Sequence, residues 1–190
     1  MTAAETSSER RPLRADARRN YDALIEAARA AFREGGGETS LEEIARRAGV
    51  GIGTLYRHFP NRLALLEGVY RDEVDDLDRK SAGLLERPDA AEALHEWLEL
   101  FLDYAATKRA LFHELVEAIG KDSELLTHSR GVIERSVRAV LERAQQAGAV
   151  RSDIEAGDVL RLVGGCTMMP GSTEEQRQRM LQVVAAGLRA

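Results

Sequence analysis

Cysteine is almost absent from this chain, with Cys166 as the single example among 190 residues. An intramolecular disulfide framework and a multi-cysteine zinc or iron–sulfur site are therefore excluded. Proline (four residues) and aromatic residues (5%) are too scarce for a typical β-sandwich or barrel. No apolar run approaches the roughly 18 residues of a membrane span, and no apolar stretch follows Arg10 and Arg11 as it would in a signal peptide. These absences predict a cytoplasmic protein with no membrane partner.

Acidic residues outnumber basic ones, and the net charge of −5 taken alone argues against a nucleic-acid partner. The charge is unevenly distributed. Residues 1–71 hold 12 Arg against 10 acidic residues, whereas residues 72–190 hold 15 basic against 22 acidic residues. Between Ile44 and Leu66 there are four Arg and no acidic residue. Because a phosphate backbone responds to local charge, this stretch remains compatible with DNA binding.

Apolar residues recur at spacings of three and four along the whole chain, which predicts an all-α fold of about nine helices. A first helix with an apolar face from Tyr21 to Phe32 should end at the glycines 35–37. Ser40 should begin a second helix and form a capping box with Glu43. The further helices are expected at 53–59, from Asn61 to Leu77, at about 89–105, 112–119, 133–144, 156–169 and 173–188, with Pro60 ending the third.

Two short helices joined by a tight turn at Gly49 form the pattern of a helix-turn-helix. Ala45 and Ala48 are small enough for the two helices to approach closely. The third helix would expose Gly51, Gly53, Thr54, Arg57 and His58 toward a DNA groove, where short side chains let the backbone come near bases and phosphates. Arg46, Arg47 and Arg62 flank it and are placed to bind phosphates on either side. Leu55, Phe59, Ile44 and Ala45 are interpreted as core.

Residues 14–70 resemble the DNA-binding domain of TetR-family transcriptional repressors. The matching residues are Ala27, Ala28, Phe32 and Gly35, the runs 40–50 and 51–59, and Leu63 and Leu66. The resemblance implies that Tyr56 and His58 contact phosphates and that Thr54 faces the bases. Arg62 stands where the family usually has lysine, and Gly51 where it usually has Ser or Thr. The predicted DNA-contacting residues are thus Ser40, Arg46, Arg47, Gly51, Gly53, Thr54, Tyr56, Arg57, His58, Arg62, Arg14 and Arg18.

The N-terminal arginines have two interpretations. The polar residues 1–12 are expected to form a disordered tail, which would act only as a solubilising segment. Arg14 and Arg18 adjoin the first helix and could instead belong to an arm that contacts the DNA backbone or enters the minor groove. The predicted organisation is a tail over 1–12, a helix-turn-helix domain over 13–62 and a helical C-terminal domain over 63–190.

By the same resemblance, the C-terminal domain would enclose a pocket for a small-molecule effector and form a homodimer. The candidate pocket residues are Trp97, Phe101, Tyr104, Phe112, His113, Cys166, Met168 and Met169, although such a stripe is also typical of a core. Gly164 and Gly165 each cost a helix about 1 kcal/mol relative to Ala, which favours a close helix–helix contact, either between two chains or within one. A two-fold dimer would bind a pseudo-palindromic operator in double-stranded DNA.

No pattern predicts an enzyme, a cofactor or a metal site. Gly51-Ile52-Gly53 lacks the third glycine of a dinucleotide-binding motif, and no strand precedes it. His95 with Glu99 and His113 with Glu117 have the spacing of ordinary exposed helical pairs. The sequence therefore predicts a ligand-responsive DNA-binding regulator that acts as a repressor. The alternative is a non-enzymatic helical adaptor that binds proteins and has no DNA specificity.

Overall fold

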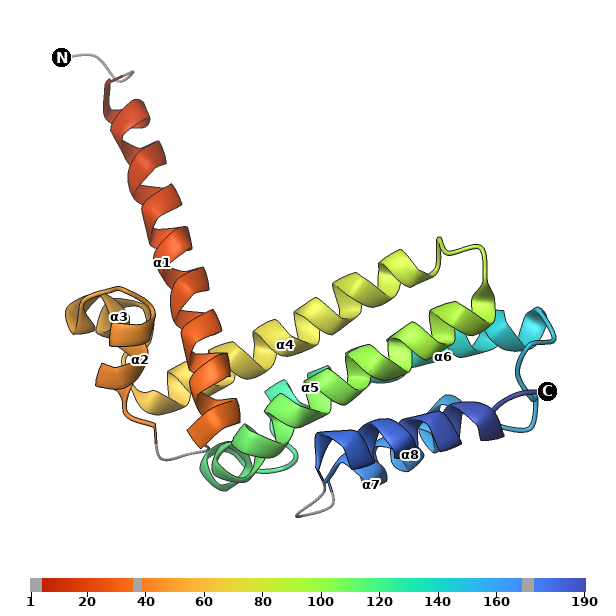
Figure 1. The fold of residues 1–190 in the computed structure, drawn as a ribbon. Coiled ribbons are helices and arrows are strands. Elements are labelled where there is room, and N and C mark those ends of the chain that lie inside the picture. Colours follow the sequence, from red (N-terminus) through yellow and green to blue (C-terminus); the bar gives the residue numbers. More distant parts are fainter. Residues whose placement is uncertain (1–4, 36–38, 169–172) are drawn as a thin grey trace. The chain divides into compact units, whose positions relative to one another are not determined.

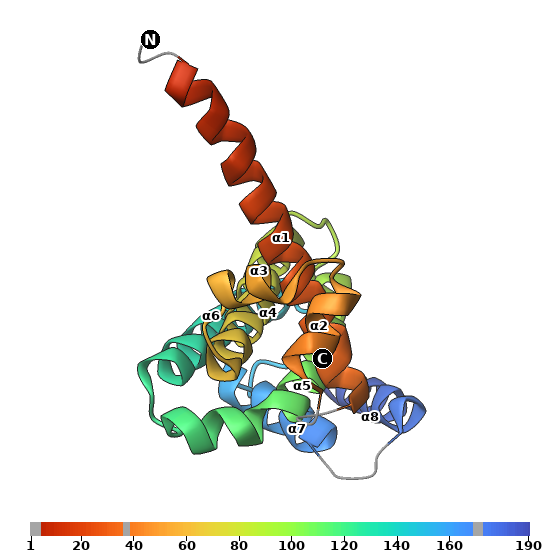
Figure 2. The same ribbon diagram turned by 90° about the vertical axis from the view of Figure 1, so that its left-hand side faces the viewer.

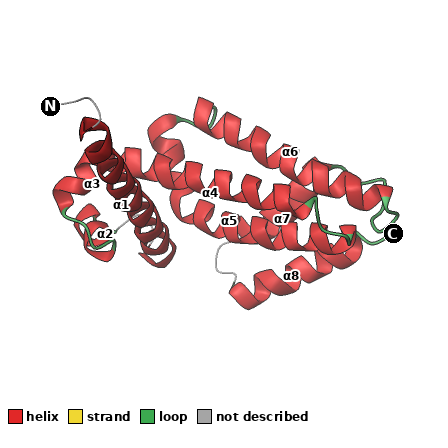
Figure 3. Cartoon of the chain, turned by 90° about the horizontal axis from the view of Figure 1, so that it is seen from above, coloured by secondary structure: helices red, strands yellow, loops and turns green. Residues whose placement is uncertain are grey.

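A computed structural model of the chain describes residues 5–35, 39–168 and 173–190, with the side chains of 5–14, 35, 167 and 168 outside the description. The described residues form helices joined by turns, and one isolated bridge between Val150 and Arg189 is their only β pairing (Figures 1 and 3). The predicted all-α fold is confirmed. The helices are α1 (Glu5–Gly35), α2 (Leu41–Arg47), α3 (Ile52–His58), α4 (Arg62–Leu84), α5 (Ala90–Ile119), α6 (Glu124–Gln146), α7 (Ala156–Met168) and α8 (Glu174–Gly187).

The chain divides into two compact units, residues 1–69 and 70–190. The division falls inside α4, between Val69 and Tyr70, so this helix contributes residues to both units. The sequence-based boundary at residue 62 marked the start of α4.

In the first unit, α1, α2 and α3 pack against one another around a small apolar core (Figure 2). Residues of α1, α2, α3 and the start of α4 are buried together in this unit: Leu24, Ile25, Ala28, Ala31, Phe32, Ile44, Ala45, Leu55, Phe59, Leu65, Leu66 and Val69. The four residues interpreted as core of the helix-turn-helix are confirmed as buried, because Ile44, Ala45, Leu55 and Phe59 are each no more than 3% exposed.

The turn between α2 and α3 depends on Gly49. Its φ of +69° lies in the left-handed region, which glycine adopts without the steric penalty of a side chain. The next short helix, α3, has only seven residues, and its N-cap is Gly51, which offers no side chain to cap it. Such a short helix is marginal by itself, so α3 is held by Leu55 (0% exposed) and Phe59 (3%) packed into the core.

The Phe59 ring packs against two other helices of this unit. It lies 5.2 Å from the ring of Tyr21 on α1, measured between centroids. On α4 it lies against Gly68, where a Cβ atom would stand 2.8 Å from Phe59 Cε1 and 3.3 Å from Ile25 Cδ1. Because Gly68 has no side chain, the Phe59 ring can occupy this space.

In the second unit, α5 packs against α6, α7 and α8, and α7 packs against α8 (Figure 1). Trp97 is fully buried on α5, stacks on Phe101 at 5.2 Å, and donates from Nε1 to Ser136 Oγ on α6 at 3.2 Å. Phe101 in turn stacks on Tyr104 at 5.6 Å. This aromatic row forms the centre of the unit's core.

Two elements differ from the sequence-based expectation. The helices expected at 89–105 and 112–119 are one continuous helix, α5, because neither glycine nor proline interrupts residues 90–119. The expected disordered tail over 1–12 is also wrong from Glu5 onward, since α1 begins there. A helix already formed by the apolar face from Tyr21 to Phe32 extends at little cost, because propagation is easier than nucleation.

Among the described residues, no helix is both long enough and apolar enough to cross a membrane.

Replacing Gly68 by Ala should lower the free energy of unfolding by about 1 kcal/mol. The added methyl group overpacks the site against the buried Phe59 ring at a cost of about 1–3 kcal/mol, which outweighs the gain of about 1 kcal/mol in helix propensity. Gly83→Ala, in the same helix but with no atom within 4 Å of the added Cβ, is the control and should not lower stability. Thermal unfolding followed by circular dichroism checks this, and a Gly68→Ala variant as stable as Gly83→Ala would contradict it.

Candidate nucleic-acid interface

The outer face of α3 is open to solvent. Tyr56 is 46% exposed, and Gly51, Gly53 and Arg57 are also exposed, whereas Thr54 is half-buried. The structure thus brings six of the predicted DNA-contacting residues onto α3 and its N-cap: Gly51, Gly53, Thr54, Tyr56, Arg57 and His58. Leu55 is fully buried and anchors the helix to the core.

Contacts among the described residues do not require glycine at position 51, the N-cap of α3, or at position 53 within the helix. A Cβ atom built at Gly51 or Gly53 would meet no atom within 4 Å, and neither residue has a positive φ. The fold therefore accepts a side chain at both positions. A close approach by something outside the chain would explain why both positions are glycine.

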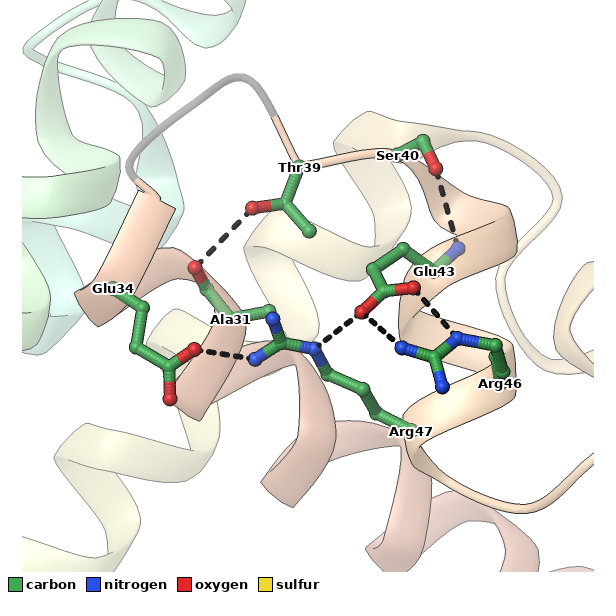
Figure 4. Close-up of polar contacts among 7 residues, drawn as sticks. All are labelled: Ala31, Glu34, Thr39, Ser40, Glu43, Arg46 and Arg47. Carbon is green, nitrogen blue, oxygen red and sulfur yellow. Dashed lines mark hydrogen bonds and ion pairs between the residues drawn. The ribbon is translucent and has the colours of Figure 1, made fainter.

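The two arginines at the end of α2 are engaged in an ionic cluster (Figure 4). Arg46 donates from Nε and Nη2 to the two oxygens of Glu43 at 2.8 and 2.7 Å. Arg47 donates from Nε to Glu43 Oε1 at 2.8 Å and from Nη1 to Glu34 Oε2 on α1 at 2.6 Å. We call these four residues the Glu43 cluster. It joins α1 to α2 and pairs two guanidinium groups with two carboxylates.

Glu43 is consequently held in its ionised form. Hydrogen bonds from Arg46 and then Arg47 lower the pKa of its carboxyl to about 2. These bonds also modify the expected capping box. Ser40 Oγ accepts from the Glu43 backbone N–H at 3.2 Å as predicted, but the Glu43 side chain binds the arginines. Two charged donors bind a carboxylate more strongly than the backbone N–H of the N-cap residue does.

Arg62, predicted to bind phosphate, has partners inside the first unit. Its Nη1 donates to the backbone oxygen of Thr39 at 2.6 Å, and its guanidinium carbon lies 5.2 Å from the centre of the Phe32 ring. Thr39 Oγ1 in turn donates to the backbone oxygen of Ala31 at 3.2 Å. Arg62 therefore fixes the end of the connection between α1 and α2. Its predicted phosphate contact remains a prediction.

The remaining predicted contacts lie around this face. His58 is half-buried, with its ring 6.0 Å from that of Tyr21 in an edge-on arrangement. Arg18 belongs to α1 and pairs with Asp22 at 2.9 Å, with both side chains exposed. The side chain of Arg14 lies outside the described residues.

The predicted effector-pocket residues do not share one environment. Trp97, Phe101 and Tyr104 are buried core residues, while Phe112 and Cys166 are half-buried. The His113 side chain is 87% exposed and lies 3.5 Å from Glu117, so it does not line the interior of the bundle. The Met168 side chain and Met169 lie outside the described residues. The other histidine pair, His95 with Glu99, is 3.6 Å apart and also on the surface.

Sequence patterns did not indicate a set of polar groups that lie buried between α4 and α5 in the second unit. The hydroxyl groups of Tyr70 and Tyr104 lie 3.0 Å apart, and Thr107 donates to Glu73 Oε1 at 2.9 Å. Burial raises the pKa of Tyr104 well above its usual range, and Tyr70 adds to the shift. Each pair joins residues 34 positions apart, so spacing within a single helix could not reveal them.

A hollow of about 690 Å³ also lies between α4 and α5, with Lys80, Arg87, Glu96 and Asp103 among its lining residues. Its charged groups include the ion pairs of Lys80 with Asp76 at 2.7 Å and of Arg87 with Glu96 at 3.1 Å. None of the predicted pocket residues lines this hollow. It is therefore a charged surface feature distinct from the aromatic row.

Removing Arg62 should lower stability, because the backbone oxygen of Thr39 and the Phe32 ring lose a charged partner. We expect Arg62→Ala to reduce the free energy of unfolding by about 1–2 kcal/mol. Arg57→Ala, which removes an exposed arginine of α3, should change it by less than about 0.5 kcal/mol. Denaturant unfolding at equilibrium checks both variants. Equal stability of the two variants would show that Arg62 has no structural role.

Comparison with known proteins places this architecture in a family. A family model described as "Bacterial regulatory proteins, tetR family" matches residues 24–69, and one described as "Transcriptional regulator SbtR-like, C-terminal domain" matches residues 89–190. A probable acrEF/envCD operon repressor of Escherichia coli is 29% identical over 167 residues, which cover 80% of this chain and 74% of that protein.

Solved structures agree with these matches. The TetR transcriptional regulator SCO0520 of Streptomyces coelicolor is 38% identical with a TM-score of 0.79, covering 89% of this chain and 98% of that one. A TetR regulatory protein of Mycobacterium vanbaalenii is 31% identical with a TM-score of 0.75, covering 94% and 100%. The chain therefore belongs to the TetR family of DNA-binding transcriptional regulators, as the resemblance of residues 14–70 predicted.

Proposed function

We propose that this regulator represses transcription by placing α3 in the major groove of an operator. The observation that carries the proposal is the solvent-facing side of α3, where two glycines with free space around them stand next to exposed Tyr56 and Arg57. Gly53, Thr54 and Arg57 would approach or read bases, and Tyr56 and His58 would bind phosphates. Leu55 and Phe59 would hold the helix in place from its other side.

We propose further that two copies of the chain associate through α7 and α8. Leu162 on α7 is 47% exposed and Val183 on α8 is 73% exposed, the two highest values among the large apolar side chains that are open to solvent in the described part of the chain. A Cβ atom built at Gly164 or Gly165 would meet no described atom within 4 Å, so packing among the described residues does not account for the paired glycines. A second copy seated on this face would cover the apolar side chains and use the small residues for close approach.

The operator proposal predicts that selection from a genomic DNA library recovers one inverted repeat. Its half-sites should lie one turn of DNA or a multiple apart, because a two-fold dimer presents two copies of α3. The logarithm of the affinity should fall linearly with the logarithm of the salt concentration as counterions are released. Val183→Glu should yield a monomer by light scattering and lose the preference for the complete repeat.

Leu85→Glu, which adds the same charge at an apolar residue 38% exposed in the connection after α4, is the control and should remain dimeric. Salt-sensitive binding without an enriched motif would reduce the function to sequence-independent DNA binding. Absence of binding at low salt would contradict the proposal and favour the protein-binding adaptor. A Val183→Glu variant that stays dimeric would exclude α8 as the dimer contact.

An effector would act on the second unit. We propose that it binds beside the aromatic row of Trp97, Phe101 and Tyr104, where the buried hydroxyls of Tyr70 and Thr107 supply polar partners within an apolar bundle. Few polar groups in mainly apolar surroundings are typical of small-molecule sites. The effector would favour a dimer geometry in which the two α3 helices no longer match successive major grooves.

If an effector releases the operator in this way, the two ligands must oppose each other equally. A compound that weakens operator binding by a given factor should bind the operator-bound dimer more weakly by the same factor. The second factor is measured by titrating the compound against free protein and against DNA-bound protein. Both titrations are followed by the fluorescence of Trp97, the single tryptophan of the chain. A compound that does not bind the operator-bound dimer at all would act by direct competition, and unequal finite factors would mean that it acts irreversibly, for example by denaturing the protein.

A further inference from the structure

The arginines of α2 are not freely available to a DNA backbone. The carboxylate of Glu43 accepts all three of the hydrogen bonds that tie it to Arg46 and Arg47, at 2.7 to 2.8 Å. The Arg46 side chain is nevertheless 74% exposed, whereas those of Arg47 and Glu43 are 34% and 32% exposed. A phosphate can therefore reach Arg46, but it must compete with a carboxylate already bound in the same two-pronged geometry that phosphate would use.

The two arginines differ in how firmly they are held. Arg46 has Glu43 as its only carboxylate partner among the described residues, while Arg47 is also bound by Glu34 on α1 at 2.6 Å. If the Glu43 charge is removed, Arg47 keeps Glu34, but Arg46 loses its partner. The exposed guanidinium of Arg46 would then become available to a DNA phosphate.

We propose that Glu43 limits the sequence-independent affinity of this protein for DNA by competing with phosphates for Arg46. The inference rests on the proposed function, because it assumes that α2 faces the DNA backbone. Binding to non-operator DNA depends almost entirely on phosphate contacts. Pairing of Arg46 with Glu43 should therefore lower the affinity for non-operator DNA more than the affinity for the operator. Binding to an operator also draws on the base contacts of α3, which Glu43 does not touch. Glu43 is thus a specificity-determining residue outside the recognition helix.

Glu43→Gln tests this inference with little change to the fold. The Ser40 cap is kept because it binds the backbone N–H of residue 43, and Gln is a usual residue at this position of a helix. Glu42→Gln is the matched control. Glu42 is an exposed residue of the same first helical turn with no ion pair in the described part of the chain, so its loss changes the net charge equally without releasing an arginine.

The measurement is the affinity of the full-length protein for a random-sequence duplex across a series of salt concentrations. Glu43→Gln should bind about five- to tenfold more tightly at 0.1 M salt, and the plot of log affinity against log salt should steepen by about 0.9, the increment of one added phosphate contact. Glu42→Gln should keep the wild-type slope. Adding Arg46→Ala to Glu43→Gln should abolish most of the gain, which shows that Arg46 carries it.

Three results would overturn the inference. A Glu43→Gln variant that binds no better than Glu42→Gln would show that Glu43 does not mask Arg46. A weaker Glu43→Gln variant with unchanged thermal stability would show that Glu43 instead holds the arginines ready for phosphate. Wild-type protein with no salt-dependent affinity for DNA would overturn the proposed function itself, and this outcome is distinguishable because it needs no variant.

Discussion

The proposed recognition helix, α3, has only seven residues, and this short length constrains the packing of the first unit. A helix of that length cannot persist by itself, and α3 lacks even a capping side chain at Gly51. Its position is therefore determined by two apolar anchors, Leu55 and Phe59. Because Phe59 packs on both Tyr21 and Gly68, the orientation of α3 depends on α1 and α4 together. The outer face of α3, where the DNA contacts are proposed, takes no part in this apolar packing.

Around α2, ion pairs and charged hydrogen bonds add to these apolar contacts. Arg47 bridges Glu43 on α2 and Glu34 on α1, and Arg62 holds the backbone oxygen of Thr39 at the entrance to α2. Exposed ion pairs contribute little to stability one by one, so the effect of this network is chiefly on geometry and on local charge. The acid-free stretch from Ile44 to Leu66 is basic in sequence, but part of its charge is neutralised by carboxylates that lie just outside it.

Sequence patterns predicted features that depend on local spacing. The core positions of Ile44, Leu55 and Phe59 followed from helical periodicity. A helix was expected from Asn61 onward, and the Oδ1 of Asn61 accepts from the Ala64 N–H at 2.8 Å at the start of α4. The pairing of Glu43 with Arg46 also has the spacing of helical neighbours and could have been inferred. It was missed because the capping-box pattern assigned the same carboxylate to the N-cap.

Contacts between helices could not be inferred in this way. Arg47 and Glu34 are 13 positions apart, and Arg62 and Thr39 are 23 apart, with turns of unknown direction between them. The same applies to the Tyr70–Tyr104 pair, which joins α4 to α5. A single sequence specifies which faces are apolar, but the register between two packed faces follows only from three-dimensional packing. For the same reason, the phosphate contact assigned to Arg62 leaves out its contacts within the chain, with the backbone oxygen of Thr39 and the Phe32 ring.

Helix α4 gives the proposed regulation a physical route. Gly68 seats Phe59 in the first unit, and two residues further along the same helix Tyr70 lies 3.0 Å from Tyr104 in the second. Buried hydroxyl groups must keep hydrogen-bond partners, so an effector that takes the place of one partner would favour a different setting of α4 around Tyr70. In the first unit, the Phe59 ring packs closely against Gly68, so a displacement of this part of α4 would also move the end of α3.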